Sequence, residues 1–385
     1  MPSQPPAGDP APPDGALPPE ALAAAGGNGF GVYLHVPYCA SRCGYCDFNT
    51  YTADELGPEP GASRATWAQA AIAELRLARR VLGEADLPVS TVFVGGGTPT
   101  LLPPDDLSRV VAAIAVEFGL APDAEITTEA NPDSVTEESL SRLRAAGFTR
   151  VSLGMQSARP HVLAVLDRTH TPDRPAEAAA EARRAGFEHV NLDLIYGTPG
   201  ESPDDWRASV AAAIDAGPDH VSAYALIVEE GTRLAARVRR GELPPPDGDD
   251  QADKYEVADE LLAAAGFSWY EVSNWASGPA ARCRHNELYW TGGDWWGVGP
   301  GAHSHIGGTR WWNVRHPAAW AGRLAAGRSP AHAREILDGD ARRMERVMLE
   351  ARLADGLDLA VLDGAGHGAA ADLVADLVDD GLVEA

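Results

Sequence analysis

Strand-like and helix-like segments alternate along the first two thirds of the chain, and this alternation limits the fold more than any other feature. Six runs rich in β-branched and aromatic residues begin near Val32, Thr91, Glu125, Arg150, His189 and Val221. Stretches with helical periodicity lie between them: Thr66–Leu82, Leu107–Phe118, Glu137–Ala146, Arg174–Ala185 and Asp204–Ala216. The pattern predicts an α/β fold with parallel strands, either a partial (β/α)6 barrel or an open doubly wound sheet.

Polar or glycine residues follow each of the first five predicted strands at the point where the strand ends. They are Tyr38-Cys39, the run Gly95–Thr98, Glu129, Gln156, and Asp193 with Tyr196. In both candidate architectures the carboxyl ends of parallel strands meet at one edge, where ligands bind. The sequence therefore predicts a site at this edge.

Composition argues against two classes of function. The formal net charge is −25 and Lys254 is the only lysine, so the chain offers no basic stripe for a phosphate backbone, and a nucleic-acid substrate is disfavoured. No apolar run reaches the roughly 18 residues of a membrane span. Residues 1–28 contain eight prolines and lack the features of a signal or transit peptide, which predicts a cytoplasmic protein.

Changes in composition divide the chain into four expected parts. They are a disordered Pro-, Ala- and Gly-rich leader over 1–28, the parallel α/β domain over 29–246, an aromatic-rich extension over 247–330, and a small C-terminal module over 331–385. Helices are expected at Gln251–Ala265, Ala341–Ala354 and Ala369–Asp379, and a short strand at 381–384. The last part is expected to be helical or winged-helix-like.

Three of the four cysteines fall within eight residues, at Cys39, Cys43 and Cys46, in the spacing C-x3-C-x2-C. Three thiolates this close can hold a [4Fe-4S] cluster and leave one iron open for an exchangeable ligand. A zinc site would require a fourth nearby ligand, and Cys283 is more than 230 residues away. The spacing favours the iron–sulfur cluster.

The cysteine motif after a first strand, together with GGGTP at 95–99 after the second, resembles the radical S-adenosylmethionine superfamily. The resemblance implies a radical-SAM barrel in which the open iron binds S-adenosylmethionine. Glycines allow close approach of the backbone, carboxylates can accept from an ammonium or ribose, and an arginine can clamp a carboxylate. By this resemblance the S-adenosylmethionine pocket is formed by Tyr33, Tyr45, Gly96, Gly97, Thr98, Glu129, Gln156, Arg168 and Asp193.

Further motifs, including YLHVPYC, TTEANP, NLDLIYGTPG and YEVSNWA, resemble the porphyrin-related branch of that superfamily. This branch contains oxygen-independent coproporphyrinogen III dehydrogenases and the related HemW haem chaperones. The resemblance implies that residues 331–385 form the C-terminal module found in these dehydrogenases. The dehydrogenases continue the motif with a fourth cysteine, where this chain has Phe48. The HNxxYW motif of HemW-like proteins implies haem binding by His285, Asn286, Tyr289 and Trp290.

Two functions are therefore expected, with the first favoured. A haem chaperone would bind the cluster, S-adenosylmethionine and one haem, and would pass haem to an acceptor protein, for example in a membrane respiratory complex. A dehydrogenase would instead make protoporphyrinogen IX by radical oxidative decarboxylation. Phe48 and the HNELYW motif at 285–290 favour the chaperone.

Overall fold

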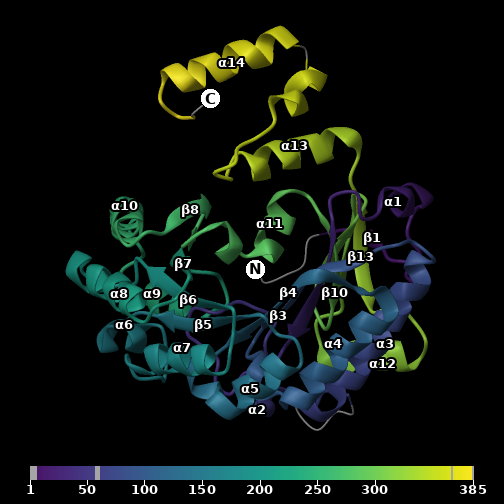
Figure 1. The fold of residues 1–385 in the computed structure, drawn as a ribbon, viewed down its shortest axis with the longest axis horizontal. Coiled ribbons are helices and arrows are strands. Elements are labelled where there is room, and N and C mark those ends of the chain that lie inside the picture. The colour runs from purple at the N-terminus through teal and green to yellow at the C-terminus, as the bar shows by residue number, and fades with distance from the viewer. Residues whose placement is uncertain (1–6, 57–60, 366, 384–385) are drawn as a thin grey trace.

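The computed structural model describes residues 7–56, 61–365 and 367–383, and within them thirteen strands form one open sheet (Figure 1). Its centre is a run of six neighbouring parallel strands in sequence order, which confirms the predicted α/β class and parallel arrangement. These strands are β2 (Phe30–Val36), β3 (Val89–Gly96), β4 (Leu120–Ala130), β5 (Arg150–Gln156), β6 (His189–Tyr196) and β7 (His220–Ala225).

Helices follow these strands, five of them at the positions that the periodicity predicts and two, at 160–165 and 233–239, at positions that it does not predict, and Figure 1 shows them in an arc outside the sheet. They are α3 (Arg64–Leu82), α4 (Pro104–Phe118), α5 (Glu137–Ala145), α6 (Pro160–Val165), α7 (Arg174–Arg184), α8 (Pro203–Asp215) and α9 (Arg233–Arg239). Thr136 and Ser202 begin α5 and α8 by accepting backbone N–H groups of the first turn. The core between helices and sheet includes the fully buried Trp67 and Trp206.

The extension lengthens the sheet at both edges. On one side β10 (Asp294–Val298) pairs parallel with β2, followed by β11 (His303–Ile306), β12 (Thr309–Asn313) and β13 (Ala331–Ile336). On the other side β9 (Asn274–Ala276) and β8 (Ser268–Glu271) continue from β7. The remaining helices before residue 339 are α1 (Pro19–Ala24), α2 (Ala53–Leu56), α10 (Gly248–Ala264), α11 (Arg284–Trp290) and α12 (Pro317–Ala325).

The structure differs from the prediction of a disordered leader over 1–28. Within the described part, β1 (Asp9–Pro10) pairs with β13, and the Ser329 N–H donates to the Pro13 carbonyl over 2.7 Å. The Gly26 N–H donates to an Asp294 carboxylate oxygen over 2.7 Å. Backbone pairing with distant segments therefore holds a stretch whose composition alone suggests disorder. Residues 1–6 lie outside the described residues.

The C-terminal region consists of α13 (Gly339–Glu350), a 3₁₀ segment at Leu359–Ala365 and α14 (His367–Asp379), which lie beyond α11 in Figure 1. The predicted strand at 381–384 is wrong for the described residues 381–383, which form a turn and bends. Because β13 belongs to the main sheet, residues 331–336 pack with the extension. No described helix combines the length and apolar character required to cross a membrane.

Candidate functional site

A cavity of about 480 Å³ lies at the carboxyl ends of the parallel strands, where the sequence predicts a site. All three motif cysteines line it. So do eight of the nine residues expected to form the S-adenosylmethionine pocket: Tyr45, Gly96, Gly97, Thr98, Glu129, Gln156, Arg168 and Asp193. Segments separated by more than 150 residues in sequence thus meet in one space of the size typical of ligand pockets.

The ninth residue, Tyr33, is not among the lining residues and is connected to the cysteine segment through His35. Burial lowers the pKa of His35 to about 4, so its ring is neutral and carries one N–H. His35 Nε2 donates to the Asn49 carbonyl over 2.9 Å, and Nδ1 accepts the Tyr33 hydroxyl over 3.0 Å. Tyr33 and His35 therefore fix the segment that follows Cys46.

The cysteine loop presents three free, partly buried thiols to the cavity. The Cys39 N–H donates to the Tyr51 carbonyl over 3.0 Å, and the Gly44 N–H donates to the Leu166 carbonyl over 3.1 Å. Burial raises the pKa of Cys39 to about 11 and that of Cys46 above its ordinary value, so these thiols hold protons until a metal displaces them. Among the described residues, no group of three or more His, Cys, Asp or Glu side chains is arranged so that it could hold a single metal ion.

Glycines of the second strand end allow the backbone to approach this loop closely. A Cβ atom on Gly97 would lie 2.5 Å from the Tyr38 carbonyl oxygen and 3.0 Å from Cys39 Sγ. Gly96 has a positive φ of 112°, and a Cβ there would lie 2.7 Å from the His35 ring. Only glycine leaves the space beside the cysteines open, so these residues fit a cluster and its ligand.

Arg168 lies beside the thiols with unused hydrogen-bonding capacity. Its Nη1 is 3.4 Å from Cys43 Sγ, its Nη2 donates to the Gly154 carbonyl over 2.8 Å, and its buried Nε has no partner. The preceding residue, Asp167, has a positive φ of 56°, and Gln156 at the end of β5 has a φ of 64°. Such conformations cost free energy and concentrate at functional sites. The guanidinium fits a carboxylate-binding role.

Two buried carboxyl groups face the cavity from the ends of β4 and β6, which lie on either side of β5. Burial, with a contribution from nearby Asp193, raises the pKa of Glu129 to about 8. Glu129 accepts the Gly96 N–H over 2.9 Å. Burial also raises the pKa of Asp193, whose oxygens accept the Ser152 hydroxyl over 2.9 Å and the Asn191 amide over 2.7 Å. This pair suits a cationic, hydroxyl-bearing ligand, since a cation would favour the ionised forms.

The pKa of Glu129 predicts how ligand binding depends on pH. A ligand ammonium interacts best with the ionised carboxylate, which is the minor form below pH 8. We expect the affinity of the cluster-loaded protein for S-adenosylmethionine to rise by up to about tenfold from pH 6 to pH 7. Equilibrium dialysis of the wild type and Glu129→Gln measures this effect. The variant should bind more weakly, and an equally steep pH dependence in the variant would contradict the assignment.

The haem-motif residues lie on α11, far from the cysteines. His285 Nδ1 is 2.8 Å from the Thr91 hydroxyl, near the start of β3, whereas Gly97 follows the end of that strand. Six residues of strand separate the two levels by roughly 20 Å. His285 is 1% exposed, its Nε2 is 2.9 Å from the Tyr289 hydroxyl, and its ring stacks on Phe93. In this conformation both ring nitrogens are engaged inside the protein.

The other motif residues also have internal partners. Tyr289 packs edge-on against Trp295, and Asn286 donates to a Glu271 carboxylate oxygen over 3.4 Å. Trp290 bonds the Glu271 carboxyl group as well. Six aromatic residues that follow the motif lie on β10 to β12 and contact one another in pairs: Trp295 with His305, Trp296 with Trp311, and His303 with Trp312.

The sequence reasoning missed several residues of the cavity wall. Ser152 and Gly154 line it at positions four and two residues before Gln156, on the same face of β5, so strand periodicity could have found them. Three large apolar side chains at the cavity are exposed to solvent: Phe48 (52%), Tyr224 (42%) and Ile227 (65%). No sequence signal identifies Tyr224 or Ile227, because only the fold brings them near Phe48.

Comparisons with known proteins agree with this architecture. The radical SAM superfamily profile matches residues 33–213. The coproporphyrinogen III oxidase HemN from Escherichia coli, described as a radical SAM enzyme, has a similar structure with a TM-score of 0.79. That likeness covers 95% of this chain and 87% of the other at 23% identity, so it shows the fold.

Relatives in sequence are closer. The heme chaperone HemW of Mycobacterium tuberculosis is 57% identical over 356 residues, which cover 92% of this chain and 90% of that protein. HemW of Escherichia coli is 35% identical over 71% of this chain and 70% of its own length. A mitochondrial radical S-adenosyl methionine domain-containing protein 1 of Mus musculus is 39% identical over 71% of this chain and 60% of its own length. The chain belongs to the HemW family of the radical SAM superfamily.

Proposed function

We propose that this protein is a haem chaperone that carries a [4Fe-4S] cluster, S-adenosylmethionine and one haem, and delivers haem to an acceptor protein. The observation that carries the proposal is the single cavity that joins three free thiols to the ligand-binding strand ends, in a chain of the HemW family. The proposed site of action is the cytoplasm, the acceptor belongs to a membrane respiratory complex, and no nucleic acid takes part.

Different cavity residues would bind the [4Fe-4S] cluster and S-adenosylmethionine. Cys39, Cys43 and Cys46 would ligate the cluster, whose open iron supplies the binding position for S-adenosylmethionine. Glu129 would accept its ammonium group, and Arg168 its carboxylate. Thr98 and Tyr45 line the cavity and would contact the methionyl end, while Gln156 and Asp193 would bind the ribose hydroxyl groups.

Haem binding is assigned to the motif on α11, with His285 as the iron ligand and Tyr289 and Trp290 as flat contacts for the macrocycle. Burial lowers the pKa of His285 to about 3, so the imidazole is neutral and can coordinate iron. The ring nitrogen that ligates iron must first leave its internal partner, which is Thr91 at Nδ1 and Tyr289 at Nε2. We therefore place haem binding in a state in which α11 has moved from the sheet.

The alternative, coproporphyrinogen III dehydrogenase activity, is disfavoured by the residue at the cavity mouth. Phe48 occupies the position of the fourth cysteine of the dehydrogenases and can supply no thiol. It is half-exposed and lines the cavity beside Cys46. An exposed apolar ring there suits contact with another molecule better than chemistry.

Hemin titration of the anaerobically reconstituted protein tests the proposal. We expect one hemin per chain with a shifted Soret band, and at least tenfold weaker binding by His285→Ala, because an axial ligand is lost. His332→Ala, which removes an exposed histidine on β13, is the matched control and should bind like the wild type. Hemin binding indifferent to His285, or anaerobic turnover of coproporphyrinogen III, would count against the assignment.

A further inference from the structure

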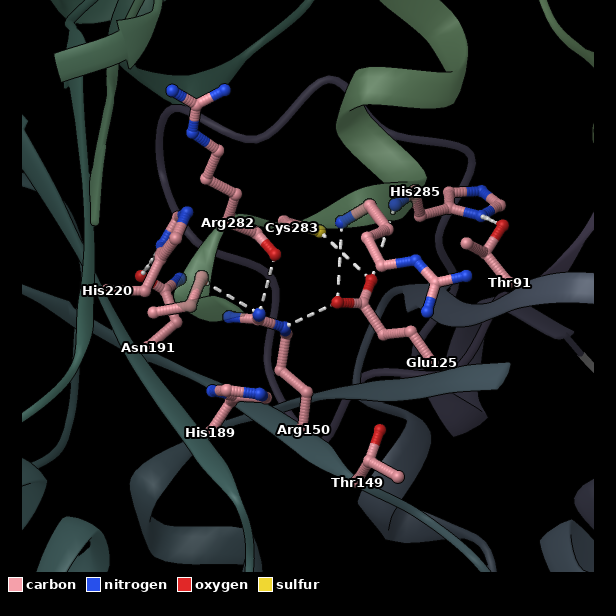
Figure 2. A network of polar contacts seen from close by, with 12 residues as sticks. Thr91, Glu125, Thr149, Arg150, His189, Asn191, His220, Arg282, Cys283 and His285 are labelled. Carbon is pink, nitrogen blue, oxygen red and sulfur yellow. Dashed lines mark hydrogen bonds and ion pairs between the residues drawn. The ribbon is translucent and has the colours of Figure 1, made fainter. Parts of the chain in front are cut away.

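A continuous chain of buried hydrogen bonds runs from the cofactor cavity to α11, and Figure 2 shows its central link, between Asn191 and His220. It begins at Asp193 in the cavity wall, whose carboxylate accepts the Asn191 amide over 2.7 Å. The Asn191 side-chain oxygen lies 2.6 Å from His220 Nδ1, and His220 Nε2 lies 2.8 Å from the Tyr270 hydroxyl. The Tyr270 oxygen accepts the N–H of Cys283, which precedes α11, over 3.2 Å.

Each hydrogen bond in this chain has a defined direction. The Asn191 side chain can donate only through its amide nitrogen, so its oxygen must accept from His220 Nδ1. Burial lowers the pKa of His220 well below its ordinary value, so the ring is neutral and Nε2 is an acceptor. The Tyr270 hydroxyl therefore donates to Nε2 and accepts from Cys283. Bonds aligned in this way polarise one another, so a change at Asp193 affects the far end.

The same end of α11 is held by a buried ion pair (Figure 2). Glu125 accepts the His285 N–H over 3.2 Å and the Arg284 N–H over 3.3 Å. Arg150 binds Glu125 over 3.1 Å and donates to the carbonyl of Arg282 over 2.9 Å. The Cys283 thiol also lies 3.6 Å from Glu125. The start of α11 is thus fixed by two connected polar groups, one of which leads to the cavity.

From this connection we infer that Asn191, His220 and Tyr270 are positioning residues that couple S-adenosylmethionine binding to α11, so that S-adenosylmethionine and haem bind antagonistically. The inference rests on the proposed haem site at His285. S-adenosylmethionine carries positive charge and favours ionised Asp193, which accepts more strongly from Asn191. The strengthened chain holds Cys283 and α11 in place. His285 then stays bonded to Thr91 and Tyr289 and is withheld from iron.

Linkage fixes the symmetry of the effect, and typical coupling free energies indicate its size. Coupling between sites usually changes affinity by about 5- to 150-fold, and the effect of each ligand on the other must be equal. We expect saturating S-adenosylmethionine to raise the hemin dissociation constant at least about fivefold. Loss or consumption of S-adenosylmethionine would then release α11 and admit haem.

The test is a hemin titration of the cluster-loaded full chain with and without S-adenosylmethionine, in the absence of reductant so that the ligand stays intact. Tyr270→Phe removes one hydroxyl from the chain and lies outside the cavity. We expect the effect of S-adenosylmethionine on hemin affinity to fall from fivefold or more to below about twofold. The affinity of Tyr270→Phe for S-adenosylmethionine, measured by dialysis, should equal that of the wild type.

Control variants separate this coupling from other causes. Tyr255→Phe removes a hydroxyl on α10 next to Trp275, outside the chain, and should keep the full effect. If Tyr270→Phe fails to fold, His220→Leu breaks the same chain. Direct competition of the two ligands for one cavity would leave the antagonism unchanged in either variant and would overturn the inference, as would equal hemin affinity with and without S-adenosylmethionine.

The failure of the proposed haem site has a different signature. Hemin affinity that does not depend on His285 rejects that site without reference to S-adenosylmethionine. Dependence on His285 without an effect of S-adenosylmethionine rejects only the coupling. Thr91→Val adds a further check, because it removes one internal bond of His285 and should tighten hemin binding several-fold. Unchanged hemin affinity in Thr91→Val would contradict the withheld state of His285.

Discussion

Cys43→Ser is expected to abolish the iron–sulfur cluster and, with it, tight binding of S-adenosylmethionine. The motif supplies only three thiolates, so the cluster has no spare protein ligand. A serine hydroxyl does not replace a thiolate on iron. Iron should fall from about four atoms per chain to near zero after anaerobic reconstitution. Because Cys43 is only partly buried, the fold should persist, as circular dichroism would show.

Cys283→Ala is the matched control for this prediction. Cys283 is the one cysteine outside the motif and is 4% exposed, with its thiol 3.6 Å from Glu125 at the opposite end of the strands. Its replacement should leave the iron content unchanged. Equal iron and sulfide in Cys43→Ser and the wild type would refute the cluster assignment, and bound zinc in the wild type would point to a different metal site.

The central strands and helices could be predicted because each is specified by local periodicity. The runs beginning near Val32 and Arg150 became β2 and β5, and Glu137–Ala146 became α5 almost residue for residue. Strand-end reasoning also placed Glu129 and Asp193 correctly at one cavity, since parallel strands must bring their carboxyl ends together.

The edges of the sheet could not be predicted, because they depend on long-range pairing. β10 lies parallel to β2 although more than 250 residues separate them, and the leader strand β1 pairs with β13 near the other end of the chain. Proline-rich composition suggested disorder for the leader, but its carbonyl groups still accept hydrogen bonds from the extension.

The haem motif shows a different limit of sequence reasoning. The residue types in HNELYW indicate which groups could bind haem, but they do not indicate which face of the seven-residue helix is buried. The contact of His285 with Tyr289 is local to the helix, but only tertiary packing brings His285 to Thr91. The left-handed backbone of Gln156 is likewise invisible in sequence, because most residues with that conformation are glycine or asparagine.

Arg150→Met is expected to destabilise the protein by about 3–5 kcal/mol, because it leaves the buried Glu125 carboxylate without its cation. Arg150 is 1% and Glu125 5% exposed at the side chain. The substitution also removes the donor to the carbonyls of Ala281 and Arg282, which precede α11. Urea denaturation followed by tryptophan fluorescence measures the change, and hemin binding should become tighter in any folded fraction, since α11 is less firmly held.

An exposed ion pair provides the comparison. Arg142 and Asp105 lie 2.6 Å apart with side chains 48% and 75% exposed, so Arg142→Met should cost less than about 1 kcal/mol. Both variants remove one arginine from a pair, and they differ in whether water can solvate the remaining carboxylate. Equal denaturation midpoints for the two variants would mean that the buried pair of Glu125 and Arg150 contributes no more stability than an exposed pair and does not fasten α11 to the sheet.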